Sequence, residues 1–84
     1  MKEITLTVTN KLGLHARPAA AFVQTAAAFQ SQISISTGTK EADAKSILGV
    51  LGLGVRQGTV ITIRVQGSDE NEAVSALQAF FETL

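Results

Sequence analysis

The sequence predicts a single α+β domain over residues 1–84. The expected fold is an open-faced β-sandwich, in which three helices cover one face of a four-stranded, mainly antiparallel sheet. Two observations lead to this fold class. The apolar periodicity changes along the chain in the order β-α-β-β-α-β-α, and each expected strand has one apolar face and one face rich in Thr and Ser. A sheet of this kind packs helices on its apolar face and leaves the other face to water.

The first half of the chain contains four of the expected elements. Alternation at residues 3–9 predicts a strand, and a loop follows at residues 10–14. Apolar residues at helical spacing then predict a helix over about residues 16–29. A second strand is expected at residues 32–36, and after a turn residues 40–43 return as a short polar edge strand.

The second half begins with a short helix over about residues 46–53. Three glycines are expected to end it: Gly52, Gly54 and Gly58. Residues 61–66 alternate as the last strand, and Asp69 is the expected N-cap, within a capping box, of a terminal helix whose apolar stripe reaches Leu84. Four phenylalanines are expected to fill the core, with Phe29 and one of the terminal pair partly exposed: Phe22, Phe29, Phe80 and Phe81.

The composition excludes several classes of function. Seven Lys and Arg balance seven Asp and Glu, whereas a nucleic-acid-binding domain usually has a basic surplus. The absence of cysteine excludes disulfides and fits a reducing cytosol, and a single histidine argues against a zinc site. No signal peptide is visible, and no segment has the ~20 apolar residues of a membrane span. We therefore expect a cytoplasmic protein that uses no metal or cofactor. We also expect it to be a monomer.

The single histidine lies in the most informative segment of the chain, Gly13-Leu14-His15-Ala16-Arg17-Pro18-Ala19-Ala20. Proline is favoured in the first turn of a helix, which places His15 at or just before a helix N-terminus. Unpaired backbone N–H groups and the positive end of the helix dipole suit this position to an anion. The preceding glycine supplies the tight backbone that leads the loop into the helix. Although a lone histidine is more often a capping, surface or core residue, this setting indicates a phosphoryl group carried on His15.

The residues around His15 support this interpretation. The planar guanidinium of Arg17 matches phosphate oxygens, and the backbone N–H groups of Ala16 and Arg17 are expected to bind them too. No carboxylate occurs in this segment, and a neutral imidazole nitrogen needs no general base to attack phosphorus. A metal-dependent phosphatase or nuclease would instead need clustered acids.

The octapeptide resembles the active-site signature of the HPr family, the histidine-containing phosphocarriers of the bacterial sugar phosphotransferase system. A second segment, Ala44-Lys45-Ser46-Ile47-Leu48-Gly49-Val50, resembles the family's regulatory-serine segment, and the resemblance covers essentially the whole chain. It implies that His15 accepts a phosphoryl group from Enzyme I, which is charged by phosphoenolpyruvate. It also implies that His15 passes the group to an Enzyme IIA during sugar uptake. Such a carrier is a substrate of its partners, not an autonomous enzyme.

The second segment has two further features. Ser46 is an ordinary N-cap, worth ~1 kcal/mol, or by resemblance a regulatory site for an HPr serine kinase/phosphorylase, and both interpretations stay open. The apolar residues that follow cover more of a short helix than one core-facing stripe, so some of them must be exposed. By resemblance, Ile47, Leu48 and Leu51 contact partner proteins.

Three alternatives remain. An HPr-like carrier could serve a nitrogen-related or dihydroxyacetone phosphorelay with the same chemistry. A small acylphosphatase-like hydrolase would instead turn over acyl phosphates without partners and keep no stable phosphohistidine. A regulatory module resembling the catabolite-repression paralogue of HPr would lack the active-site histidine, so the presence of His15 argues against it.

Overall fold

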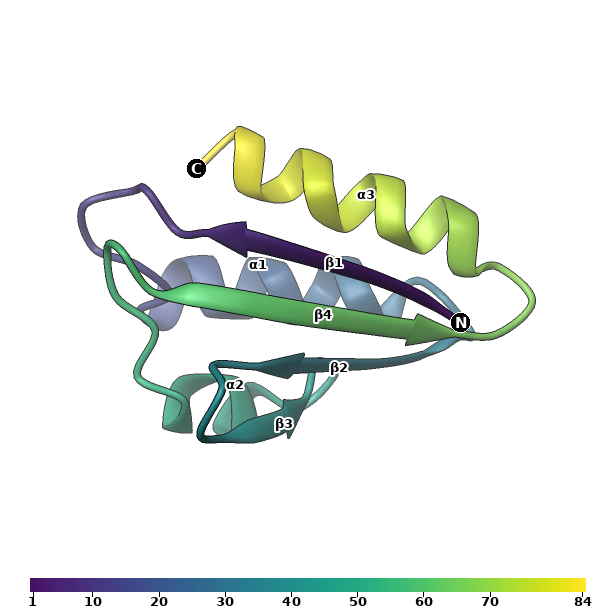
Figure 1. Ribbon diagram of the computed structural model, residues 1–84, viewed down its shortest axis with the longest axis horizontal. Helices are drawn as coiled ribbons and strands as arrows, with labels where there is room; N and C mark the ends of the chain where they lie inside the picture. The colour runs from purple at the N-terminus through teal and green to yellow at the C-terminus, as the bar shows by residue number, and fades with distance from the viewer.

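The computed structural model describes residues 1–84 and has the predicted order of elements (Figure 1). They are β1 (Lys2–Thr7), α1 (Ala16–Ala27), β2 (Gln32–Ser36), β3 (Glu41–Asp43), α2 (Ile47–Gly52), β4 (Val60–Gln66) and α3 (Glu70–Glu82). The four strands form one sheet in the order β1-β4-β2-β3, and all three pairings are antiparallel. The predicted α+β open-faced sandwich is therefore confirmed, and residues 41–43 form the expected edge strand.

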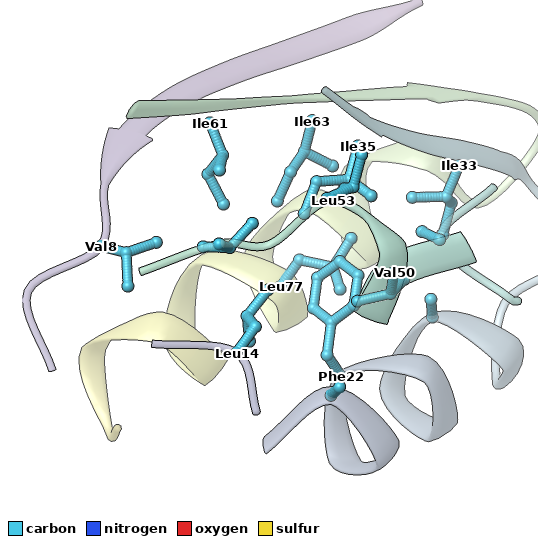
Figure 2. Close-up of a cluster of buried hydrophobic side chains, with 14 of the residues drawn as sticks. Val8, Leu14, Phe22, Ile33, Ile35, Val50, Leu53, Ile61, Ile63 and Leu77 are labelled. Carbon is cyan, nitrogen blue, oxygen red and sulfur yellow. The ribbon is translucent and has the colours of Figure 1, made fainter. Parts of the chain in front are cut away.

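The register of the sheet puts the apolar residues of neighbouring strands on one face. Ile63 of β4 pairs with Ile4 of β1 on one side and with Ile35 of β2 on the other. The helices cover this face, and Figure 2 shows Ile61, Ile63, Ile33 and Ile35 pointing from the strands toward Phe22, Val50 and Leu77 of the helices. The opposite face is polar, and Thr5 and Thr62 share a hydrogen bond on it at 3.2 Å.

One cluster of sixteen buried hydrophobic residues forms the core. Phe22 is fully buried, and its ring centroid lies 5.8 Å from that of Phe80 and 5.6 Å from that of Phe81. Tilted aromatic pairs at this separation are favourable beyond the area they bury. Phe29, Phe80 and Phe81 are all half-buried, so both residues of the terminal pair are partly exposed and not one alone.

Helix α1 ends two residues earlier than its apolar pattern predicts. The N–H groups of Ala28 and Phe29 donate to the carbonyl oxygens of Thr25 and Ala26, three residues back. The hydrogen bonds therefore change from the four-residue spacing of an α-helix to a tighter three-residue spacing after Ala27. The apolar stripe predicted for α3 also stops short, because Leu84 lies beyond the helix and is 40% exposed.

Gly52 does not break helix α2 as predicted, because it still has helical geometry and is the last residue of the helix. The helix stops where the N–H groups of Leu53 and Gly54 bond three residues back, and Gly54 then adopts a left-handed φ of 65°. A glycine takes that conformation without the steric penalty of a side chain. Of the three glycines, Gly54 therefore marks the exit from the helix.

Asp69 is the N-cap of α3, but it does not form the expected capping box, since its side chain makes no cap hydrogen bond. Its carboxylate instead accepts the N–H of Gln30 at 2.8 Å, the N–H of Ser31 at 3.0 Å and the Ser31 hydroxyl. Ser31 is only 2% exposed. This clamp, defined as Asp69 with residues 30–31, joins the segment after α1 to the start of α3.

The clamp predicts a loss of stability in acid. The hydrogen bond from Ser31, followed by that from the Gln30 N–H, lowers the pKa of Asp69 below its ordinary value of 3.8. Because the unfolded chain then takes up the proton first, the contribution of the clamp is complete above about pH 4 and is lost as the pH falls through the folded pKa. We expect the midpoint of urea unfolding to decrease below about pH 4.

The control for this prediction is Asp69→Asn. Asparagine cannot carry the charge, so this variant should be less stable at neutral pH and should lose less stability between about pH 4 and pH 2. Some acid dependence will remain, because the Gly67 N–H lowers the pKa of Glu70 in the same direction. An acid slope as steep as that of the parent chain would show that Asp69 is not its source.

Candidate functional site

His15 is the N-cap of α1. Its backbone is extended, with φ −79° and ψ −172°, and its carbonyl oxygen accepts the N–H of Ala19 at 2.8 Å. Pro18 lies in the first turn, where the N–H that proline lacks would have had no acceptor within the helix. The His15 side chain is exposed and forms no capping hydrogen bond, so the imidazole nitrogens are free.

The start of α1 is also rich in unused donors. The N–H groups of Ala16 and Arg17 have no acceptor within the protein, as is usual for the first turn of a helix. Arg17 is exposed and takes part in none of the three ion pairs of the molecule. His15 is thus followed directly by two unpaired backbone donors, and the second of these residues carries an unpaired guanidinium, a set of groups suited to binding a phosphoryl group.

The loop before His15 is packed against the loop that leads into β4. The N–H of Leu14 donates to the carbonyl oxygen of Val55 at 3.1 Å, and both side chains are buried. Gly13 has a φ of 62°, and a Cβ at this position would overlap the Val55 oxygen and the Cα of Arg56. Only glycine fits this contact, which joins the loop before His15 to the loop that precedes β4.

Helix α2 packs beside α1, toward the lower left of Figure 1. Three of its apolar residues are exposed to solvent: Ile47, Leu48 and Leu51 are 37%, 80% and 38% exposed. We call these three residues the α2 patch. The predicted exposure is therefore found, and Arg17 is the only charged residue in α1 and α2 together.

Ser46 is the N-cap of α2, as the sequence predicts. Its hydroxyl oxygen accepts the N–H of Gly49 at 3.1 Å, and its carbonyl oxygen accepts the N–H of Val50 at 2.9 Å. The preceding Lys45 donates from Nζ to the carbonyl oxygen of Phe29 at 2.7 Å, which ties the start of α2 to the chain after α1. The capping role of Ser46 is thus present, and the serine is half-buried.

Comparison with known proteins decides the family. A sequence profile described as the PTS HPr component phosphorylation site matches residues 2–83. The chain belongs to the HPr family. It is an HPr phosphocarrier protein of the phosphotransferase system (PTS).

Individual relatives of the HPr family support this assignment over almost the full chain. The phosphocarrier protein HPr of Xylella fastidiosa (strain Temecula1) is 55% identical over 82 residues, covering 98% of this chain and 92% of the relative. The HPr-like protein Crh of Halalkalibacterium halodurans is 48% identical and covers 98% of each chain. Among solved structures, HPr-C-His from Thermoanaerobacter tengcongensis superposes with a TM-score of 0.95 at 52% identity, covering 99% of this chain and 93% of that one.

Two hollows of this HPr-family chain lie away from His15. They measure about 610 and 410 Å³, lie against the polar face of the sheet and share Glu41 and Arg64. Arg64 is paired there with Glu3 at 2.8 Å, and this hydrogen bond raises the pKa of the arginine. His15 lies instead on an exposed helix end, which suits contact with a protein surface more than enclosure of a small substrate.

No helix has the length and apolar character that crossing a membrane requires.

The sequence interpretation did not single out Asn10, which lies close to His15 in the chain. The Asn10 side chain donates from Nδ2 to the carbonyl oxygen of Gly13 at 2.9 Å, inside the loop that carries His15. The sequence does indicate this turn, since Asn at the first and Gly at the fourth position are typical of a β-turn.

Proposed function

We propose that this HPr-family chain accepts a phosphoryl group on His15 from phosphoenolpyruvate-charged Enzyme I and passes it to an Enzyme IIA in sugar uptake. The carrier acts as a monomer in the cytoplasm. One observation carries the proposal: at the start of α1 the unbonded imidazole of His15 is followed by two residues with unpaired N–H groups, the second of which is an unpaired arginine. Ala16, Arg17 and His15 thus form one site at the start of α1.

The chemistry is a reversible displacement at phosphorus. A lone pair on the imidazole attacks the phosphoryl group of the donor, a P–N bond to His15 forms, and the bond to the donor breaks with its electron pair. The N–H groups of Ala16 and Arg17 and the guanidinium stabilise the charge on the phosphoryl oxygens. In the second transfer the acceptor attacks, and His15 leaves as a neutral imidazole.

The direct test uses the unaltered protein. After incubation with phosphoenolpyruvate and Enzyme I, mass spectrometry should show the addition of one phosphoryl group. The modification should be lost in acid, because a phosphohistidine P–N bond is acid-labile. A mass that does not change in the presence of active Enzyme I would reject the proposal.

The same assay separates the alternatives. A carrier in a nitrogen-related or dihydroxyacetone phosphorelay would be phosphorylated preferentially by the Enzyme I of that pathway and would transfer to its acceptors. An acylphosphatase-like hydrolase would turn over an acyl phosphate without any partner. A Crh-like regulatory module would lack the phosphorylatable His15 that this chain has.

The α2 patch is proposed as the docking surface for both partners. It lies on the helix that packs beside α1, and the scarcity of charge on these two helices suits an apolar partner surface. Nuclear magnetic resonance (NMR) shift mapping with Enzyme I and an Enzyme IIA should place both footprints on the patch and around Arg17. Footprints confined to the polar face of the sheet would contradict this assignment.

A substitution can test the same surface. Leu48 is 80% exposed, so Leu48→Ala should leave the fold intact and raise the KM of Enzyme I for the carrier by about tenfold, the effect of losing one interface anchor. The matched control is Val60→Ala, which removes an exposed apolar side chain from β4 instead. Equal KM values for the two variants would argue against docking at Leu48.

Ser46 is proposed as a regulatory phosphorylation site for an HPr serine kinase/phosphorylase. A phosphate adds about −1.5 to −2 charge beside the α2 patch, which opposes burial of that patch under a partner. We expect Ser46→Asp to keep near-normal stability, because Asp can also cap a helix, and to reduce His15 phosphorylation by Enzyme I several-fold.

The control is Ser46→Asn, which caps without a charge and should be phosphorylated normally. Enzymatically phosphorylated Ser46 should behave like the Asp variant. If both negatively charged forms accept phosphate from Enzyme I at the normal rate, Ser46 is a helix cap and no more.

A further inference from the structure

The loop before His15 is closed by a single side chain, that of Asn10. Its Nδ2 donates to the carbonyl oxygen of Gly13 at 2.9 Å, while the Gly13 N–H donates to the Asn10 carbonyl oxygen at 3.2 Å. These two bonds lock the turn from residue 10 to residue 13. On its other side the turn meets Val55, whose oxygen accepts the N–H of Leu14. The backbone is therefore held up to the residue before His15.

Stability alone does not account for the Asn10 side chain. Its Oδ1 is enclosed by the protein but accepts no hydrogen bond from it. A buried acceptor without a donor is unfavourable, and this cost opposes the gain from the Nδ2 bond. We therefore expect the amide to fix the shape of the turn through its Nδ2 bond while adding little to the free energy of unfolding.

We propose that Asn10 is a positioning residue for His15, acting through Gly13 to hold the imidazole in place for in-line attack on phosphorus. The inference rests on the proposed function, because it concerns how His15 meets a phosphoryl donor. Asn10 itself is no catalytic residue, since its donor group is engaged by Gly13. In-line displacement demands accurate placement of the nucleophile, and an error of about 1 Å can slow a reaction by about 100-fold.

The test compares Asn10→Ala with Gln57→Ala. Gln57 is a matched control because its Nε2 donates to the carbonyl oxygen of Thr9 at 3.1 Å, which is also an amide-to-backbone bond but lies outside the turn. Steady-state phosphorylation by Enzyme I, with each carrier as the varied substrate, gives kcat and KM. We expect Asn10→Ala to lower kcat by about tenfold or more. Its KM and urea midpoint should stay close to those of the parent, and Gln57→Ala should match the parent in all three.

A second measurement does not depend on transfer. The ¹⁵N heteronuclear NOE of residues 13–15 should fall in Asn10→Ala and stay unchanged in Gln57→Ala. A parental kcat in Asn10→Ala overturns the inference. A fall in kcat also overturns it if the urea midpoint falls clearly as well, because the variant is then generally destabilised. An unaltered chain that Enzyme I cannot phosphorylate would reject the proposed function instead. In that case unchanged NOE values would still reject the role of Asn10 in holding the loop, and reduced values would support it.

Discussion

His15→Ala is expected to abolish acid-labile phosphorylation by Enzyme I and phosphoenolpyruvate. The side chain is the only imidazole in the protein, and no cysteine is present to replace it as a nucleophile. The measurement is the mass of the carrier before and after acid treatment. Because the ring is exposed and forms no capping bond, the free energy of unfolding should change by less than about 0.5 kcal/mol.

The unfolding measurement is the control for this prediction. A folded variant without label assigns the phosphoryl group to His15, whereas an unfolded variant would say nothing about the site. Acid-labile label at the parental level in folded His15→Ala would mean that another residue accepts the group. The proposed function would then have to be abandoned for His15.

Arg17→Ala is expected to give the second largest effect. It removes the only charged side chain of α1 and α2, two residues along the chain from the proposed nucleophile His15, and leaves the two backbone donors in place. Removal of one preorganised charge-stabilising donor typically slows a reaction by about 100- to 1,000-fold, and we expect a loss of one or more orders of magnitude in transfer rate. Arg17→Lys should restore the rate only in part, because an ammonium keeps the charge but not the planar fork.

The control for Arg17 is Arg64→Ala, which removes an exposed arginine from the polar face of the sheet. This variant should transfer at the parental rate. Rapid-quench measurement of single-turnover transfer separates the chemical step from docking. A parental single-turnover rate in Arg17→Ala would show that the guanidinium takes no part in the chemistry.

Local pattern was sufficient for the elements of this fold and for the position of His15. Alternation such as that of Ile61, Ile63 and Val65 reports which face of a strand is buried, and Pro18 places the helix start. The end of α1 was predicted too late, because the tightening after Ala27 depends on backbone hydrogen bonds that side-chain pattern does not report.

Contacts between distant segments could not be predicted from the sequence. Asp69 looks like the first residue of a capping box, but its carboxylate is used by Gln30 and Ser31, 39 and 38 residues away. The loop before His15 depends on a distant contact in the same way. Gly13 is required there because the carbonyl oxygen of Val55 lies against it. Such pairings follow from the way the sheet brings the loops together, and the sequence of one loop does not contain them.

The unused donors at the start of α1 have a consequence for the loaded and empty carrier. His15 occupies the N-cap position without capping the helix through its side chain. Under the proposed function, a phosphoryl group on His15 would bring acceptor oxygens to the N–H groups of Ala16 and Arg17, and would serve as a detachable cap. Each round of transfer would then tighten and release the first turn of the helix. The free energy of capping the first turn would then contribute to the equilibrium for transfer of the phosphoryl group to the acceptor.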